Sequence, residues 1–188
     1  MIPSTLHHSV RLVHVVRNSI VSHIDLAPRS DVARLLYVNT KMATCPCGLT
    51  ETGSKPSGTG RHDPRASPAK EYATCCGRYL DGGEAAPTAE ALMRSRYTAY
   101  TLRREDYLLQ TWHSDTRPAS LGLEDETDRK WLELEIKRHE QPEPGRALVE
   151  FVARYKVAGR AHRLHEVSRF VREAERWLYV DGDIRNAK

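Results

Sequence analysis

The sequence predicts an α+β protein, in which helices pack on one face of a curved antiparallel sheet and a small four-cysteine module precedes them. Three observations indicate this class. Apolar side chains recur at helical spacing between residues 88 and 112, strand-like alternation begins at residue 132, and all the cysteines stand in two close pairs ahead of both. A chain of 188 residues can bury a core as one domain with a small appendage.

The helical part begins after a proline. Thr88 is expected to cap the first helix, with Glu90 in its first turn. One face of this helix carries larger side chains at positions i, i+4 and i+7, namely Met93, Tyr97 and Tyr100. A second, shorter helix is expected from about residue 105 to residue 112, and a turn at 113–118 should end it before Pro118.

The last third of the chain predicts a strand meander. Strands are expected at 132–137, 149–157, 162–172 and 177–181. Turns are expected at 142–145, 158–160 and 173–175. Short turns between successive strands imply an antiparallel sheet, because parallel strands need long crossover connections.

The cysteines are the first candidate site. They are Cys45, Cys47, Cys75 and Cys76. Two thiols from each of two tight turns can offer four sulfurs to one tetrahedral ion, and zinc is the usual occupant of such a site. Cross-pair disulfides or unused thiols are the alternatives. Four protein sulfurs would leave no position for water or substrate, so the zinc would be structural. Backbone N–H groups at Gly48 and Gly77 are expected to bond the sulfurs.

These residues also carry a resemblance to known proteins. Cys45-Pro46-Cys47-Gly48, followed by Tyr72-Ala73-Thr74-Cys75-Cys76-Gly77, resembles the SEC-C motif, the small zinc module of the secretion ATPase SecA and several other proteins. The continuation through 79–83 and 86–97 is similar to the YchJ family of uncharacterised bacterial proteins. The resemblance implies a SEC-C zinc module at 42–83 and a nuclear-transport-factor-2-like cone at 84–185. It implies no particular activity.

Two segments depart from this family pattern. Residues 1–41 are expected to be disordered or not translated, since family members begin near Met42. The two cysteine pairs are separated by 27 residues, Gly48 to Thr74, and the Pro, Gly, Ser and Arg-rich insert near 57–69 is expected to be a flexible loop. A threefold longer loop costs only about 1 kcal/mol in closure entropy. Structural zinc binding is worth roughly 10–16 kcal/mol, so the insert should not prevent it.

A cavity between the helices and the sheet is the second candidate site. Its expected lining is polar and aromatic: Arg94, Tyr97, Trp112, His113, Glu150, Arg154, Glu166, Ser168, Trp177 and Tyr179. A buried carboxylate beside an arginine or histidine can act as an acid–base pair. An internal salt-bridge network would use the same residues without chemistry, and it is favoured because no catalytic motif accompanies them. Alternation leaves open which sheet face points inward, but His165 and Glu166 must point to opposite faces.

The Arg94-Ser95-Arg96-Tyr97 signature lies in the first helix. With nearby arginines and tyrosines it suggests an RNA contact. Packing and salt bridges within the helical core are the favoured interpretation, because the resembling family repeats this signature there.

Composition limits the remaining function classes. No apolar run approaches the roughly 20 residues that span a bilayer, and the formal charge of +4 does not indicate a DNA-binding protein. Thiols used as ligands fit a reducing compartment, so a cytoplasmic location is expected. We expect a non-catalytic protein whose zinc module docks to a protein or ribosomal partner, as the SecA module docks to its chaperone. Basic residues near the module suit an acidic partner: Lys55, Arg61, Arg65, Lys70 and Arg78. The alternative is an enzyme or small-molecule binder that uses the cavity.

Overall fold

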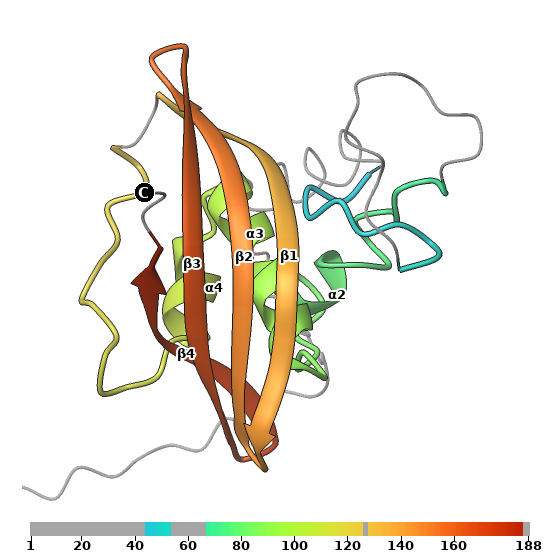
Figure 1. Ribbon diagram of the computed structural model, residues 1–188, viewed down its shortest axis with the longest axis vertical. Coiled ribbons are helices and arrows are strands. Elements are labelled where there is room, and N and C mark those ends of the chain that lie inside the picture. The colour runs from blue at the N-terminus through green and yellow to red at the C-terminus, as the bar shows by residue number, and fades with distance from the viewer. Residues whose placement is uncertain (1–43, 54–66, 126–127, 186–188) are drawn as a thin grey trace, which may run out of the picture.

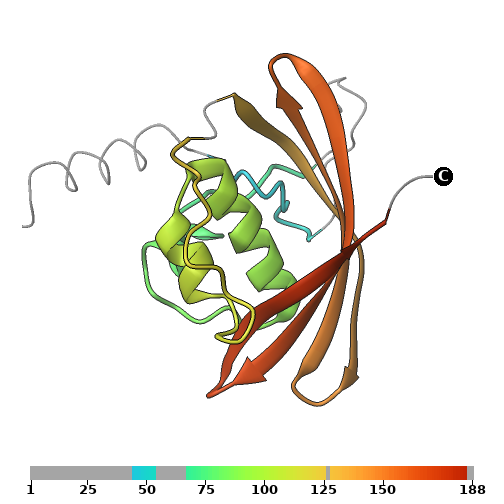
Figure 2. The same ribbon diagram turned by 90° about the vertical axis from the view of Figure 1, so that its left-hand side faces the viewer.

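The computed structural model describes residues 44–53, 67–125 and 128–185. Helices α2 (Gly77–Leu80), α3 (Ala89–Leu102) and α4 (Glu105–Gln110) lie on one face of a single sheet (Figure 1). The strands are β1 (Arg129–Glu143), β2 (Arg146–Val157), β3 (Arg160–Glu173) and β4 (Arg176–Ile184). Figure 2 shows the sheet curving around the helices. The predicted arrangement of helices on one face of an antiparallel sheet is confirmed.

Helix α3 begins and ends where local chemistry requires. The Thr88 side chain accepts a hydrogen bond from the Ala91 N–H at 3.1 Å, which satisfies one of the free donors of the first turn. Arg103 ends the helix in the left-handed conformation with φ of 57°. The expected cap at Thr88 is therefore confirmed. The expected second helix ends at Gln110, two residues earlier than predicted.

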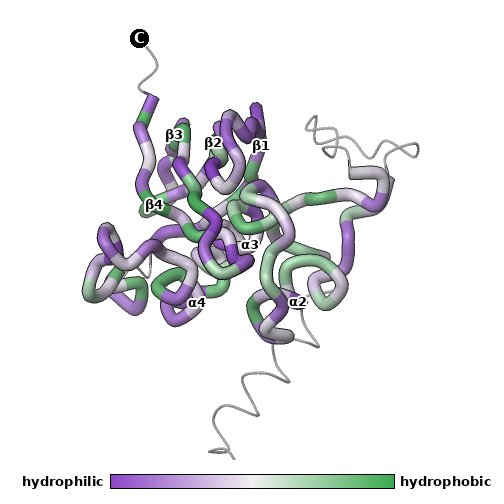
Figure 3. Tube along the Cα trace, turned by 90° about the horizontal axis from the view of Figure 1, so that it is seen from below, coloured by the Kyte–Doolittle hydropathy of each residue, from purple (hydrophilic) through white to green (hydrophobic). Residues whose placement is uncertain are grey.

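The sheet is a meander in the order β1-β2-β3-β4, and every pairing is antiparallel. The turn after β2 places Ala158 and Gly159 at φ of 47° and 81°, and the turn after β3 places Ala174 and Glu175 at 43° and 64°. Positive φ at both central positions gives a backbone twist that matches the twist of the flanking strands. Figure 3 looks nearly along the strands and shows α2, α3 and α4 on the same side of the sheet.

The strands are longer than the alternation predicts, and β1 shows why. It extends over 129–143 where the pattern predicts 132–137. Pairing with β2 continues through register shifts after Trp131, Ile136 and Glu140, which break the simple alternation without ending the ladder. Pro142 is tolerated because β1 is an edge strand, where a missing N–H need not break the ladder.

The core lies between α3 and the concave face of the sheet. Val149, Phe151 and Ala153 of β2 and Phe170 of β3 are buried there together with Leu92 of α3. The opposite, convex face carries charged pairs. Among the described residues, no helix is long and apolar enough to span a bilayer.

The four-cysteine module lies beside α3. Isolated antiparallel bridges join Thr44 to Glu71 and Thr50 to Ala69, so the segments that carry the two cysteine pairs run side by side. The extension 1–41 and most of the insert near 57–69 lie outside the described residues.

Candidate metal centre and cavity

The structure brings the four cysteine sulfurs together. Their Sγ atoms all lie within 4.8 Å of one another, and the Sγ atoms of Cys47 and Cys75 are 3.6 Å apart. A tetrahedral ion with metal–sulfur bonds of about 2.3 Å requires sulfurs about 3.8 Å apart, which is close to this arrangement. All four cysteines are buried and none forms a disulfide, so the cross-pair disulfide alternative is not found. The donor set therefore fits a soft or borderline divalent ion.

Backbone hydrogen bonds hold the two cysteine turns. The Cys45 N–H donates to the Lys70 carbonyl at 2.8 Å, which ties the first turn to the strand-like segment before the second. The Tyr72 carbonyl accepts from the N–H groups of Cys75 and Gly77, at 3.1 and 2.8 Å. A Cβ atom at Gly77 would lie 2.8 Å from that carbonyl oxygen, so this close turn requires glycine.

The expected bonds from glycine N–H groups to the sulfurs are not found. The Gly48 N–H donates to the Cys45 carbonyl at 3.2 Å, and the Gly77 N–H donates to the Tyr72 carbonyl. Both amides close tight turns, and that geometry aims them at carbonyl oxygens.

The sulfur cluster also contacts α3. Thr98 Oγ1 lies 3.9 Å from Cys45 Sγ, and Arg94 Nη1 donates to the Cys47 carbonyl at 3.4 Å while pairing with Glu90 at 2.9 Å. The cysteines belong to the same buried cluster as Leu92, Met93 and Tyr97 of α3. The module is therefore packed onto the larger domain.

The charges of the four thiols depend on one another. Hydrogen bonds from the other three cysteines, Cys47 first, lower the pKa of the Cys45 thiol despite its burial. Hydrogen bonds with Cys45 first, and then with Cys47 and Cys75, raise the pKa of the Cys76 thiol, because they hold its proton on the sulfur. Four thiolates at this separation need a cation between them.

A cavity of about 170 Å³ lies between α3 and the concave face of the sheet. Arg129 and Trp131 of β1 line it, as do Glu166 and Ser168 of β3 and Tyr179 of β4. Four of the ten predicted cavity residues line it: Tyr97, Glu166, Ser168 and Tyr179.

The prediction for Glu150 and Arg154 is wrong. Phe151, which lines the cavity, lies opposite Glu166 in the β2–β3 register, so the residues one position away point to the convex face. Glu150 pairs there with His165 at 2.8 Å, and Arg154 pairs with Glu133 at 3.2 Å. His165 and Glu166 point to opposite faces, as expected.

The other four predicted residues lie outside the cavity wall. Trp112 packs edge-on against Tyr179 with ring centroids 4.8 Å apart, and His113 bonds Glu173 at 3.1 Å. The Trp177 indole N–H donates to the Pro87 carbonyl at 3.3 Å. Arg94 points to the cysteine module, because it is two helix positions from Arg96 and so lies on a different face of α3.

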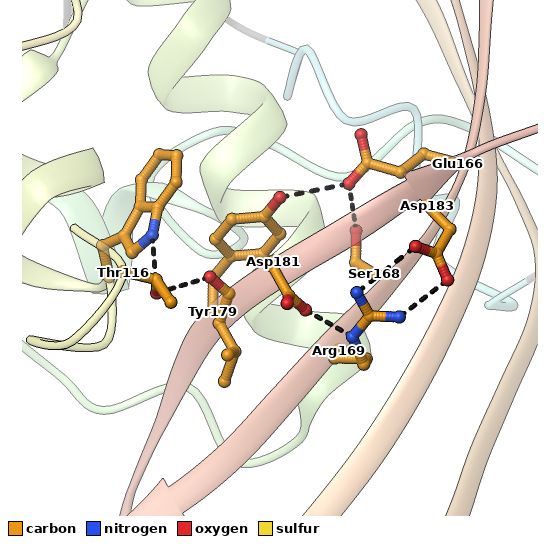
Figure 4. A network of polar contacts seen from close by, with 9 residues as sticks. Thr116, Glu166, Ser168, Arg169, Tyr179, Asp181 and Asp183 are labelled. Atoms are coloured by element: carbon orange, nitrogen blue, oxygen red, sulfur yellow. Dashed lines mark hydrogen bonds and ion pairs between the residues drawn. The ribbon is translucent and has the colours of Figure 1, made fainter. Parts of the chain in front are cut away.

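Glu166 is held at the cavity by donors from two strands. The hydroxyl groups of Ser168 and Tyr179 both donate to Glu166 Oε1, at 2.7 and 3.3 Å (Figure 4). A side chain at Gly182, on the neighbouring strand, would overlap the Glu166 carboxylate, so glycine leaves the space that this side chain occupies. Arg169 forms a separate network with Asp181 and Asp183.

Arg96 is one of the eight cavity residues that the sequence analysis missed. Its side chain is almost fully buried, and Nη1 donates to the Leu108 carbonyl and to Thr111 Oγ1, at 2.7 and 2.8 Å. The guanidinium carbon lies 4.5 Å from the centre of the Tyr179 ring, and burial lowers the pKa of Arg96. No carboxylate among the described residues lies within ion-pair distance of it, so the expected salt-bridge role does not hold for Arg96.

Helical spacing could have identified Arg96. It lies one turn from Met93 and Tyr100, at i, i+3 and i+7, on the α3 face that lines the cavity. The neighbouring Ser95 is also fully buried, and its hydroxyl lies 2.7 Å from the Tyr107 hydroxyl. The signature 94–97 is thus used for packing and internal hydrogen bonds.

Comparison with known proteins supports this architecture. A family profile described as the YchJ middle NTF2-like domain matches residues 88–182. A UPF0225 protein of Polaromonas naphthalenivorans is 54% identical over 143 residues, which is 74% of this chain and 96% of that protein. A UPF0225 protein of Bordetella pertussis is 55% identical over 139 residues, covering 73% of this chain and all of that protein.

Two solved structures are also similar. The solution structure of a SEC-C motif containing protein from Rhodopseudomonas palustris matches with a TM-score of 0.57 and 31% identity, over 63% of this chain and 95% of that one. The crystal structure of a SEC-C motif containing protein from Psychrobacter arcticus matches with a TM-score of 0.58 and 26% identity, over 77% of this chain and 84% of that one.

Proposed function

This chain belongs to the YchJ family, with a SEC-C motif and an NTF2-like domain, and on that premise we propose that its four thiolates hold a structural Zn²⁺ ion. The observation that carries the proposal is the cluster of four buried Sγ atoms within 4.8 Å of one another. Zinc favours such a tetrahedral sulfur set, and with every position taken by protein the ion has no open site for catalysis. Its contribution is therefore to join the two cysteine turns.

Elemental analysis tests the metal directly. Chain purified under reducing conditions without added zinc should contain about one zinc per molecule, as the four-sulfur set requires. Cys47→Ser should lose the ion, because a neutral hydroxyl cannot replace a thiolate ligand. Thr74→Ala is the matched control, since Thr74 is exposed, adjoins Cys75 and bonds only the Glu71 carbonyl. Folded, reduced chain without stoichiometric metal, or with another metal in its place, would refute the proposal.

The second part of the proposal is that the module docks to a protein or ribosomal partner. The module packs beside α3 outside the cavity wall, and its turns expose polar side chains. Of the basic residues expected near the module, Lys55, Arg61 and Arg65 lie outside the described residues, and Arg78 pairs with Glu84 at 2.6 Å. Support for docking therefore comes from the module itself, and not from charge complementarity to an acidic partner.

Partner capture separates docking from a role for the cavity. Cys47→Ser should abolish retention of the chain by ribosomes or by a co-purifying protein, whereas Glu166→Gln should leave retention unchanged. The opposite pattern would contradict docking through the module. The proposal also implies a reducing compartment such as the cytoplasm, where thiolates stay available to the metal.

A further inference from the structure

The cavity under α3 has its own chemistry, separate from the metal centre. We propose that it binds a small aromatic acid that carries a hydroxyl group at the end of the ring opposite its carboxylate, of the 4-hydroxybenzoate class. Three features favour this class: the volume of the cavity, the polar groups on two of its walls, and the arginine side chains that already pack on its aromatic rings.

Size restricts the ligand to about one ring. The cavity has a volume of about 170 Å³. An engineered cavity of about 150 Å³ holds benzene, whereas drug-sized ligands need roughly 300 Å³ or more. A single six-membered ring with two small substituents is the largest planar molecule that this space accepts without rearrangement.

Arg96 and Glu166 suit a hydroxyl group. Both residues contact Tyr179: the Arg96 guanidinium packs on the face of its ring, and its hydroxyl donates a hydrogen bond to Glu166. The two hydrogen bonds of Arg96 come from Nη1, which leaves Nε and Nη2 as donors. Glu166 receives both of its hydrogen bonds on Oε1, and Oε2 carries none (Figure 4). A ligand hydroxyl can accept from Arg96 and donate to Glu166, whereas a carboxylate there would face a like charge.

The β1 side of the cavity suits the carboxylate. Arg129 and Trp131 line this wall, and the Arg129 guanidinium carbon lies 5.8 Å from the centre of the Trp131 ring. Arg129 is the positively charged residue of this wall, and its guanidinium has five N–H donors. Guanidinium groups bind carboxylates through two parallel hydrogen bonds.

A cationic ligand is disfavoured although the lining is aromatic. Aromatic rings attract cations over their faces. Here the chain supplies those cations itself, since Arg129 lies 5.8 Å from the centre of the Trp131 ring and Arg96 lies 4.5 Å from the centre of the Tyr179 ring, and both rings line the cavity. A second cation would meet these like charges.

Calorimetric titration of the full-length, metal-containing chain tests the proposal with four probes. We expect 4-hydroxybenzoate to bind at least about tenfold more tightly than benzoate or phenol, because each of these lacks one charged-group hydrogen bond. Benzamidine, the cationic ring, should not bind. The proposal is overturned if 4-hydroxybenzoate does not bind at millimolar concentration, if the three neutral or anionic probes bind equally, or if benzamidine binds most tightly.

Two substitutions locate the site. Ala153→Met should fill the cavity and abolish binding, since Ala153 lines it from β2. Arg129→Gln should weaken the binding of 4-hydroxybenzoate about tenfold or more and leave the binding of phenol unchanged. This result would locate the ligand even if the Ala153→Met variant fails to fold. Arg154→Gln is the control, because Arg154 is a β2 arginine on the convex face. Equal weakening by the two arginine variants, or full binding by Ala153→Met, would place the ligand elsewhere.

Discussion

Replacing Ser95 by alanine should destabilise the chain more than its small size suggests. Ser95 is fully buried in α3, where its hydroxyl donates to the Leu92 carbonyl at 2.8 Å and lies 2.7 Å from the Tyr107 hydroxyl. Because the only Ser95 proton goes to Leu92, the Tyr107 hydroxyl must be the donor of the second bond. Ser95→Ala therefore leaves a buried O–H donor without an acceptor. Tyr107→Phe removes that donor and leaves Ser95 bonded.

The two substitutions should differ in magnitude. An unsatisfied buried hydroxyl costs about 1–3 kcal/mol, and the better helix propensity of alanine returns roughly 0.5 kcal/mol, so Ser95→Ala should cost about 1–2.5 kcal/mol. Tyr107→Phe loses only the net value of one hydrogen bond, about 0.5–1.5 kcal/mol. The double variant should cost about as much as Tyr107→Phe alone, because no donor is stranded.

Urea unfolding of the metal-containing chain measures these differences, with far-ultraviolet circular dichroism and tryptophan fluorescence as two probes. The midpoint should fall at an unchanged slope, since the surface exposed on unfolding stays the same. For a chain of this size 1 kcal/mol corresponds to roughly 2–4 °C in Tm. Additive costs in the double variant, or a smaller cost for Ser95→Ala than for Tyr107→Phe, would show that the assigned donor is wrong.

Two further predictions concern charged contacts. The Glu105 carboxylate accepts hydrogen bonds from the Leu121 and Leu123 N–H groups at 2.8 and 3.1 Å, and these bonds lower its pKa. Glu105→Gln should therefore speed hydrogen exchange at those two amides and leave exchange in the strands unchanged. Equal exchange rates in the variant and the unaltered chain would contradict this anchoring role. Arg169 lowers the pKa of Asp183, so this pair stabilises the chain above the ordinary pKa of 3.8 and the effect is lost as pH falls through the lowered value. The urea midpoint of Asp183→Asn should therefore lie below that of the unaltered chain at pH 7. The difference should vanish toward about pH 2, where Asp183 is protonated, and should shrink in 1 M salt, because the pair is exposed. A difference that persists in acid would refute this.

The sequence predicted the helices and strands well, but it did not predict which face of the sheet each strand residue would point to. Thr88 and the helical spacing after it identified α3, and the short turns identified the meander. Alternation did not distinguish the two faces of the sheet, because Val152 and Val167 are buried on the convex side while Phe151 and Ala153 are buried on the concave side. The β2–β3 register, which sets Glu166 opposite Phe151, decides that Glu166 faces the cavity.

The two candidate sites differ for a physical reason. Closely spaced pairs of cysteines can be recognised in the sequence as candidate metal ligands. The structure does bring the four sulfurs together, although their role as zinc ligands stays a prediction. Cavity residues come from four strands and a helix, so their grouping depends on tertiary packing. Arg96 was missed because arginine is seldom fully buried, and here carbonyl and hydroxyl oxygens and aromatic rings take the place of a carboxylate partner.

The meander also determines how the chain can assemble. Each ladder of the sheet joins strands that follow directly in sequence, so each hairpin can close at the small entropic cost of a short loop. A contact of longer range joins the segment after α4 to β4, where the Tyr179 N–H donates to the Thr111 carbonyl and the His113 N–H donates to the Tyr179 carbonyl, at 2.9 and 2.7 Å. Because this contact joins segments far apart in the sequence, the entropic cost of loop closure favours formation of the hairpins before it.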